Sequence, residues 1–184
     1  MFFPQPIPEV ILVKPRRFED IRGYFTETFR QSLYEANGIP GPFLQDNRSL
    51  SRAPKVVRGL HFQIAPSAQG KLVRCTRGAI LDVAVDIRAG SPTFGQHVAV
   101  SLSSENGYQL YIPTGFAHGF CTLTPDCEVE YKVTAYYDPG AEHGILWNDQ
   151  DLGIDWPLPE TPPIVSDRDA LLPRLRDIPP YFSY

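Results

Sequence analysis

The chain has 184 residues, a length that suits one well-filled domain and is short for two. Its formal net charge of -4 and isoelectric point near 5.5 provide no basic surface of the kind that nucleic acids or anionic membranes attract. We therefore expect a single domain over residues 1–184 and no nucleic-acid or membrane partner.

The N-terminal segment 1–9 is interrupted by prolines and lacks the positive start and the apolar core of a signal peptide. No later apolar run reaches the length that a membrane span requires. Cys75, Cys121 and Cys127 are odd in number and are not paired at metal-ligand spacing, which is typical of buried free thiols in a reducing compartment. The sequence predicts a soluble cytoplasmic protein.

Most apolar segments are short, alternating or β-branched, and Gly, Pro, Asn or Asp separate them, which predicts an all-β domain. Helix is expected only at Arg30–Asn37, before Gly38 and Pro40, and at Ser166–Leu172. From Trp156 onward prolines are frequent, and we expect an ordered C-terminal wrap. Strands are predicted at Val10–Lys14, Tyr24–Thr28, Lys55–Gln63, Lys71–Arg77, Ala79–Arg88, Gln96–Leu102, Gln109–Ile112, Gly119–Leu123 and Glu128–Tyr136.

Alternation along these strands predicts which side chains share a face. The odd-numbered residues 81–87 are all apolar, whereas Asp82, Ala84 and Asp86 lie on the other face. Lys71 and Tyr131 each share a face with small apolar neighbours, which indicates a lined cavity. The two aspartates are expected either in that cavity, where one would orient an imidazole, or on the wet face of an edge strand.

Two motifs resemble the halves of a cupin active site. Gly107–His118 has the glycine, proline and histidine spacing of the second cupin motif. That motif closes a hairpin and directs one histidine side chain into the interior of the barrel. In metal-binding cupins the first motif supplies two histidines and a carboxylate. Here His61 is the only histidine of that motif, Gln63 follows it two residues later, and Lys71 occupies the position of the carboxylate. Because an ammonium repels a divalent cation and the remaining imidazoles are few, we expect no metal and no other cofactor.

His61 and Lys71 in one pocket suit proton abstraction beside a ketone, with histidine as the base and lysine as the cation that attracts the enolate oxygen. The alternative for His61 is a core histidine that is hydrogen-bonded to a backbone carbonyl. The alternative for Lys71 is a solvated lysine at the start of a strand. Strict alternation would place Arg58 on the face opposite His61, unless Gly59 forms a bulge that restores a common face.

Eight ordered motifs extend a resemblance over essentially the full length of the chain. They are Asp20–Glu27, Phe43–Asn47, Val57–Gln63, Gln69–Cys75, Asp82–Arg88, Ser91–Gln96, Ile112–Phe120 and Ile145–Asp149. On these motifs the chain resembles the dTDP-4-dehydrorhamnose 3,5-epimerase family. The resemblance implies a cupin-type jelly-roll barrel with short peripheral helices, a homodimer and a metal-independent isomerase. Its substrate would be a dTDP-linked 4-keto-6-deoxyglucose, inverted at carbons 3 and 5.

The resemblance also implies roles for individual residues. His61 corresponds to the general base, with Asp169 as its dyad partner, although the local sequence around Asp169 indicates only a helix N-cap. Tyr131 corresponds to the acid that returns a proton from the opposite face, and Lys71 to the cation at the enolate oxygen. The positions that match the family's nucleotide-sugar site are Arg22, Glu27, Gln45, Asp46, Asn47, Arg58, His118, Tyr137, Glu142 and Arg168.

Within that set, Tyr137 matches the position where thymine stacks, and Arg22 is expected to come from the neighbouring subunit. Arg168 stands where a relative has lysine, which keeps the charge but changes the reach. Three alternatives carry much of the same pattern. A single-centre epimerase acting at carbon 3 or carbon 5 would share every motif. A non-enzymatic cupin would bind the nucleotide sugar without proton exchange. A metal-dependent cupin oxygenase would have to hold its metal ion in the presence of the Lys71 ammonium.

Overall fold

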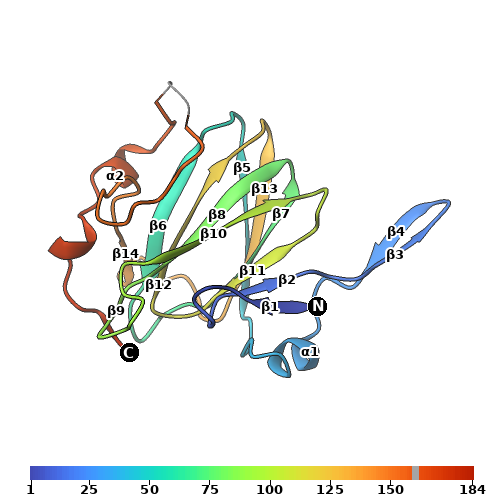
Figure 1. Cartoon of the computed structure of the whole chain (residues 1–184), viewed down its shortest axis with the longest axis horizontal. Coiled ribbons are helices and arrows are strands. Elements are labelled where there is room, and N and C mark those ends of the chain that lie inside the picture. Colours follow the sequence, from blue (N-terminus) through green and yellow to red (C-terminus); the bar gives the residue numbers. More distant parts are fainter. Residues whose placement is uncertain (159–161) are drawn as a thin grey trace.

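Figure 1 shows the computed structural model of the chain, which describes residues 1–158 and 162–184. Within these ranges two β-sheets face each other in the cupin-type jelly-roll arrangement, and two small two-stranded sheets lie at the periphery. Helical structure in the described residues is limited to α1 (Gln31–Glu35), α2 (Asp167–Ala170) and one 3-10 turn at Leu175–Asp177. The expected all-β fold with short peripheral helices is confirmed.

Each large sheet is antiparallel throughout. The first has the order β1 (Phe2–Pro4), β2 (Ile11–Val13), β11 (Gln109–Ile112), β7 (Lys71–Arg77), β13 (Cys127–Val133) and β5 (Gln45–Ser51). The second has the order β10 (His97–Ser103), β8 (Ala79–Asp86), β12 (Phe116–Thr122), β6 (Val57–Gln63) and β14 (Glu142–Gly144). The small sheets pair β3 (Arg17–Asp20) with β4 (Gly23–Thr26) and β9 (Arg88–Ala89) with β15 (Phe182–Ser183).

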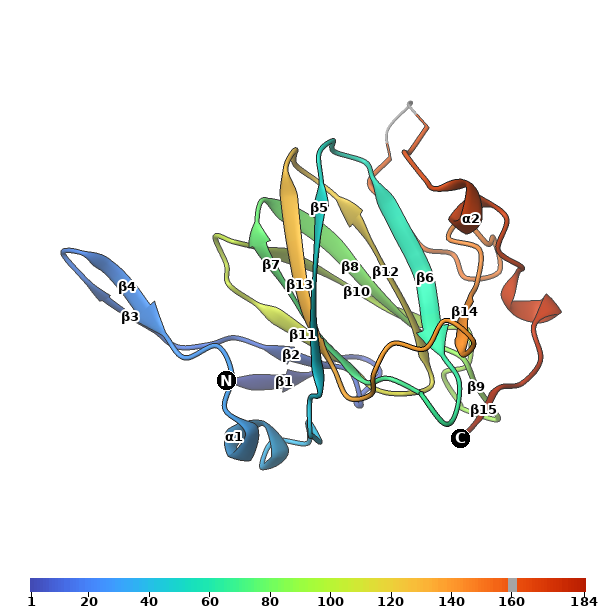
Figure 2. The ribbon, with the colours of Figure 1, turned by 180° about the vertical axis from the view of Figure 1, so that it is seen from behind.

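The alternation expected along β8 is present, and in the structure its two faces contribute to two different hydrophobic cores. Ala84 joins the core between the two sheets, on the face that also carries Asp82. Val83 and Val85 join a second core with Trp156 of the C-terminal segment. This segment lies along the β6 and β14 side of the second sheet in both views (Figures 1 and 2). For residues 156–158 and 162–184 the prediction of an ordered wrap is therefore confirmed, and these residues cover the outer apolar face; residues 159–161 of the predicted wrap lie outside the described ranges.

The predicted strand limits agree closely with the structure. The strands at 71–77 and 109–112 have the predicted bounds, and most others differ by one to three residues. The prediction missed β1, β3, β5, β14 and β15, and it did not separate β9 from β8. β5 is the instructive case: it forms the edge of its sheet, and its sequence Gln-Asp-Asn-Arg-Ser-Leu-Ser is mostly polar, so it has no apolar alternation to detect.

The hairpin of β3 and β4 projects away from the barrel, as both views show (Figures 1 and 2). Its apolar side chains have little cover: Ile21 at the tip is fully exposed, and Phe25 is 69% exposed. The predicted strand at 24–28 therefore belongs to this hairpin and not to the barrel wall. The three cysteines are buried free thiols, as expected. In the described part of the chain, no helix has the length and apolar character that crossing a membrane demands.

Candidate active site

A cavity of about 530 Å³ opens between the two large sheets and is bounded on one side by the C-terminal segment that carries α2. Its walls come from β5, β6, β7, β12 and β13 as well as from that segment. The lining residues are Ser49, Val56, Val57, Arg58, His61, Lys71, His118, Gly119, Phe120, Tyr131, Ile164, Val165, Ser166, Arg168 and Asp169. The structure thus brings all four residues expected to be catalytic to one cavity.

His61 and Asp169, 108 residues apart in sequence, form a hydrogen-bonded pair. His61 Nε2 lies 2.7 Å from Asp169 Oδ1, and the second carboxylate oxygen accepts the backbone N–H of Gly59 at 3.0 Å. Ser166 is the N-cap of α2 and accepts the backbone N–H of Asp169 at 3.1 Å, which fixes the position of the helix turn. Both carboxylate oxygens are therefore occupied, and the aspartate has one orientation.

This arrangement determines which nitrogen of His61 is available as a base. Burial raises the pKa of Asp169, but the hydrogen bonds from His61 and Gly59 outweigh it, so the pKa lies below its ordinary value. An ionised carboxylate can only accept hydrogen bonds, so Nε2 of the imidazole must carry the proton. Nδ1 then keeps its lone pair, and the His61 side chain is 28% exposed, so it is accessible from the cavity.

Lys71 is the first residue of β7, and its side chain is buried beside His61. Its Nζ donates a hydrogen bond to the backbone oxygen of His61 at 3.1 Å, and the residue is only 8% exposed. Burial lowers the pKa of Lys71 to about 8, although the charges of Asp82 and Glu142 oppose this shift. At neutral pH the side chain is thus mostly an ammonium in a poorly hydrated place, where it interacts strongly with developing negative charge.

A second imidazole–carboxylate pair lies deeper in the barrel. His118 Nε2 is 2.8 Å from Asp82 Oδ1, and both residues are buried. Burial lowers the pKa of His118, with the charge of Asp82 acting in the opposite direction. Among the described residues, Asp82 Oδ2 is the one buried side-chain oxygen or nitrogen without a hydrogen-bond partner. Of the two aspartates singled out in the sequence, Asp82 is therefore the one that orients an imidazole.

Arg58 reaches the same cavity as His61 because β6 contains a bulge. On β12, His118 and Phe120 pair with His61 and Arg58, so β6 spans the same interval with one extra residue. Gly59 has a φ of +107°, and a Cβ at this position would lie 2.6 Å from the backbone oxygen of His118. Only glycine fits there. The bulge that the sequence left as a possibility is confirmed.

Tyr131 extends from β13 toward the same space and lines both this cavity and a smaller one beside it. Burial raises the pKa of Tyr131, the charge of Glu142 raises it further, and Arg58 opposes the shift. The phenol therefore keeps its proton at neutral pH and is available as a proton donor.

The smaller cavity, of about 110 Å³, continues toward an aromatic and acidic corner. Glu142 Oε2 accepts the phenolic O–H of Tyr137 at 2.8 Å and lies 2.8 Å from a guanidinium nitrogen of Arg168. Burial acts to raise the pKa of Glu142, but these two contacts lower it below its ordinary value. The lining residues are Gln45, Asn47, His61, Phe62, Gln63, Gln69, Lys71, Tyr131, Tyr137 and Glu142.

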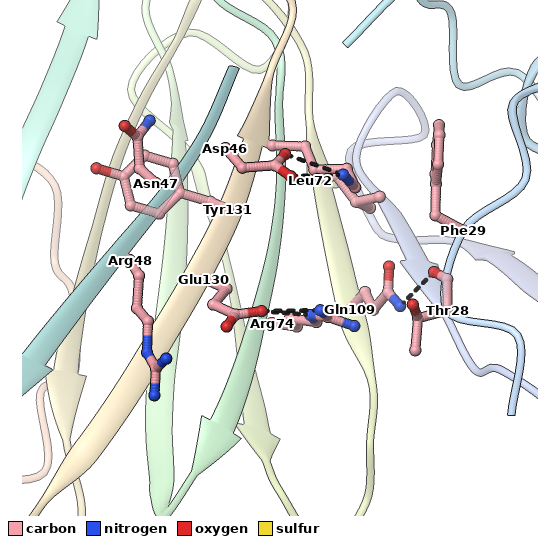
Figure 3. Close-up of a pocket in the computed structure, with 11 residues that line it drawn as sticks. Thr28, Phe29, Asp46, Asn47, Arg48, Leu72, Arg74, Gln109, Glu130 and Tyr131 are labelled. Carbon is pink, nitrogen blue, oxygen red and sulfur yellow. Dashed lines mark hydrogen bonds and ion pairs between the residues drawn. The ribbon is translucent and has the colours of Figure 1, made fainter. Parts of the chain in front are cut away.

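Three of the residues expected to bind substrate lie away from these cavities. Arg22 forms an ion pair with Asp20 at the hairpin tip, and Glu27 pairs with Arg30. Asp46 alternates with Asn47 on β5, so its carboxylate reaches the outer face of the sheet. There Lys132 Nζ lies 2.9 Å from it, beside a groove of about 210 Å³ that Asn47 and Tyr131 also line (Figure 3). Asp46 thus does not line the His61 cavity, and its expected contact with the nucleotide sugar stays a prediction.

The structure adds lining residues that the sequence reasoning did not select. Phe120 could have been found by alternation, because it lies two residues from His118 on β12 and shares its face. Ile164 and Val165 come from the proline-rich segment, where a single bridge pairs Ile164 with Val56. No local pattern marks these two residues, since the contact depends on where the C-terminal wrap returns to β6.

Comparison with known proteins identifies the family. The model of the family described as dTDP-4-dehydrorhamnose 3,5-epimerase matches residues 4–177. This chain belongs to the dTDP-4-dehydrorhamnose 3,5-epimerase family. The epimerase of that name from Pseudomonas aeruginosa is 54% identical, and the match covers 89% of each chain. The one from Salmonella typhimurium is 52% identical, and the match covers 92% of each chain. The family expected from the motifs is confirmed.

Solved structures agree with this assignment to the 3,5-epimerase family. The dTDP-6-deoxy-D-glucose-3,5-epimerase from Legionella pneumophila, in complex with dTDP-4-keto-L-rhamnose, has a TM-score of 0.94 and 44% identity, covering 100% of this chain and 98% of that chain. A 3'-monoepimerase from Streptomyces bikiniensis in complex with dTDP-quinovose has a TM-score of 0.86 and 37% identity, covering 94% of this chain and 87% of that chain. Double and single epimerases therefore share this fold.

Proposed function

We propose that this chain is an isomerase that converts dTDP-4-dehydro-6-deoxy-D-glucose to dTDP-4-dehydro-L-rhamnose by epimerisation at carbons 3 and 5. The observation that carries the proposal is that the His61–Asp169 pair, the Lys71 ammonium and the Tyr131 phenol line one cavity. The relatives named 3,5-epimerase, which are 52–54% identical to this chain, support it.

In the first half of each epimerisation, His61 Nδ1 removes the proton from a carbon next to the C4 carbonyl. The C–H electron pair moves to form the enolate, and its negative charge develops on the carbonyl oxygen. Lys71 Nζ stabilises that oxygen, a contribution whose removal typically costs about 10²- to 10³-fold in rate. Asp169 stabilises the imidazolium that forms, because His61 Nε2 already donates to its carboxylate.

In the second half, a proton must return to the same carbon from the opposite face, since return from the first face would regenerate the substrate. Tyr131 lines the same cavity, and because burial holds its pKa above the ordinary phenol value, the phenol carries the proton that this step requires. The phenolate left after transfer takes a proton from solvent, and the imidazolium of His61 releases one. The enzyme therefore returns to its starting state without an oxidant or cofactor.

The charged and aromatic residues around the reacting groups account for nucleotide-sugar binding. Arg58 and Arg168 line the large cavity and supply guanidinium groups suited to the pyrophosphate. Tyr137 is half-exposed beside the smaller cavity, where it offers a face for thymine. We assign Gln45, Asn47, Glu142 and His118 to the same site as polar contacts. Binding energy from the nucleotide would place the hexulose ring against His61.

We further propose that the active unit is a homodimer in which Arg22 acts on the neighbouring subunit. Support comes from the projecting hairpin, which holds Arg22 at its tip, apart from the cavity of its own chain, and exposes Ile21 and Phe25. Apolar side chains exposed on a projecting arm are typical of a surface that another chain covers. Because Glu27 follows β4 in sequence, we place it with Arg22 in the contribution from the partner.

We also place the protein in the cytoplasm. The support for this is the burial of Cys75, Cys121 and Cys127 as free thiols, which suits a reducing compartment. Burial raises the pKa of Cys75 to about 12 and that of Cys121 to about 11, so these thiols resist oxidation.

The decisive experiment is incubation with dTDP-4-dehydro-6-deoxy-D-glucose in deuterated water, followed by NMR of the sugar. Deuterium at carbons 3 and 5 with L-rhamno product is the expected result, and His61→Ala should abolish both exchanges. Exchange at one carbon alone would identify a single-centre epimerase. Binding of the nucleotide sugar without any exchange would identify a non-enzymatic cupin.

A further inference from the structure

The loop 134–141, between β13 and β14, carries the Tyr137 ring and is held by glutamine side chains. It has no regular secondary structure, and the residues Tyr136 and Tyr137 are 66% and 52% exposed. A segment of this kind, with solvent on one side and few sheet hydrogen bonds, would ordinarily be mobile. Its backbone polar groups must nevertheless find hydrogen-bond partners where the loop lies against the barrel.

Gln63 supplies two of these partners. Its side-chain oxygen accepts the backbone N–H of Asp138 at 3.0 Å, and its nitrogen donates to the backbone oxygens of Tyr136 at 3.2 Å and Ser67 at 2.7 Å. The residue is 4% exposed, so these bonds are protected from water. One buried amide thus fixes the backbone on both sides of Tyr137.

Two further glutamines complete the set from other strands and loops. The side-chain nitrogen of Gln69 donates to the backbone oxygen of Ala135 at 2.8 Å. The side-chain oxygen of Gln45 accepts the backbone N–H of Tyr137 at 3.0 Å, while its nitrogen donates to Asn47 at 2.8 Å. Four consecutive residues, 135–138, are therefore each bonded through the backbone to a glutamine.

Glutamine is suited to this task because one amide presents both an acceptor and two donors on a reach of three bonds. Since the contacts are to backbone, they leave the rings of Tyr136 and Tyr137 free to meet a ligand. The three glutamines also line the small cavity that runs from Tyr137 to His61 and Lys71. The loop is in this way fixed relative to the reacting groups.

We propose that Gln45, Gln63 and Gln69 form a cradle that preorganises loop 134–141 as the platform for the nucleobase. This inference rests on the proposed function and deepens it, because it makes Gln63 and Gln69 positioning residues for substrate binding. A preordered loop loses less conformational freedom when ligand binds, so the cradle acts on affinity. It does not contact the reacting carbons.

The test compares Gln63→Met and Gln69→Met with Gln150→Met, an exposed glutamine that serves as the matched control. We expect KM to rise about ten-fold in each cradle variant, since loss of the bonds frees the loop, while kcat changes less than about two-fold. Gln63→Glu keeps the acceptor for Asp138 but places a carboxylate against the backbone oxygen of Tyr136, and it should raise KM further. The control should match the wild type.

A second measurement does not depend on catalysis. In hydrogen–deuterium exchange of the free protein, Gln63→Met should speed exchange at the amides of Tyr137 and Asp138 and leave β7 unchanged. An inactive wild-type protein would contradict the proposed function, and the exchange data would still test the cradle. The proposed role of the glutamines would be contradicted by unaltered exchange in this loop or by an unaltered KM in an active enzyme. A fall in kcat as large as the rise in KM would also contradict it.

Gln69→Met keeps the inference testable if Gln63→Met does not fold, because Gln69 is only half-buried and its side chain makes a single bond to the loop. In the Gln69→Met variant, hydrogen–deuterium exchange should be faster than in the wild type at the backbone amides of Ala135 and the neighbouring residues. A folded Gln69→Met protein with wild-type exchange and wild-type KM would overturn the proposal by itself.

Discussion

Lys71 Nζ lies 3.1 Å from the backbone oxygen of His61 and donates a hydrogen bond to it. The residue proposed as the cation at the ketone and the residue proposed as the base are thus fixed relative to each other across two different sheets. The bond engages only one of the three donors of the ammonium, which leaves the others for substrate. Electrostatic stabilisation of this kind depends on such preorganisation, since no group needs to move when charge develops.

The first prediction concerns activity against pH. Because burial lowers the pKa of Lys71 to about 8, the ammonium is lost as pH rises through that value. We expect kcat/KM to fall about ten-fold for each pH unit above 8, well before an exposed lysine would titrate. The measurement is the initial rate of solvent exchange from pH 6 to 10. A flat profile up to pH 10 would contradict the role given to this cation.

A second prediction separates stability from activity at the same residue. The folded protein holds Lys71 at a pKa below the unfolded value of 10.5, so its burial as a cation costs free energy below pH 8, and this cost disappears as pH rises toward 10.5. Lys71→Met should therefore lower kcat about 10²- to 10³-fold and yet raise the free energy of unfolding by about 1–2 kcal/mol at pH 7. The gain should shrink at pH 10.

Denaturant unfolding at the two pH values measures this effect. Lys14→Met, which removes a lysine outside the cavities, is the control and should show no comparable change between pH 7 and pH 10. A Lys71→Met protein that is destabilised equally at both pH values would show that the buried charge is not the source of the cost.

Asp169→Asn tests the dyad. The amide keeps the shape of the side chain but lacks the negative charge that stabilises the imidazolium, and its N–H₂ can favour the wrong tautomer of His61. We expect kcat to fall about 10²- to 10⁴-fold with little change in KM. Nitrogen-15 NMR of the histidine ring should show the proton moving from Nε2. Retention of full activity with the wild-type tautomer would remove the dyad from the mechanism.

Tyr131→Phe should separate the two halves of the reaction. His61 and Lys71 remain, so the substrate C–H bond still breaks and the carbon still exchanges with solvent. Without the phenol, return of a proton from the opposite face should be slowed about 10²- to 10⁴-fold, whereas exchange with retention should fall far less. NMR in deuterated water measures both rates in one sample. Equal loss of exchange and inversion would indicate that Tyr131 acts in proton removal instead.

The extent to which this site follows from sequence depends on the range of the interactions. Alternation within each strand predicts that Lys71 and Tyr131 face a lined cavity, and the spacing of the cupin motif adds His61 to it. The contact of Asp169 with His61 depends on the return of the C-terminal wrap to β6, a long-range event that leaves no local pattern beyond the Ser166 cap. Gly59 lies between these cases: the residue indicated a possible bulge, but only the register with β12 establishes it.

The last prediction tests the contribution of the partner subunit. Arg22→Ala and His61→Ala should each be strongly impaired as pure proteins. If Arg22 acts on the neighbouring subunit, a mixed dimer contains one site with both residues intact, because the chain with an intact His61 receives Arg22 from its partner. Equal amounts with free subunit exchange make half of the dimers mixed, and half of their sites intact. About a quarter of wild-type activity should therefore return on mixing, measured as product formed after unfolding and refolding together. A mixture no more active than the average of the two pure variants would place Arg22 in its own chain's site or outside the site altogether.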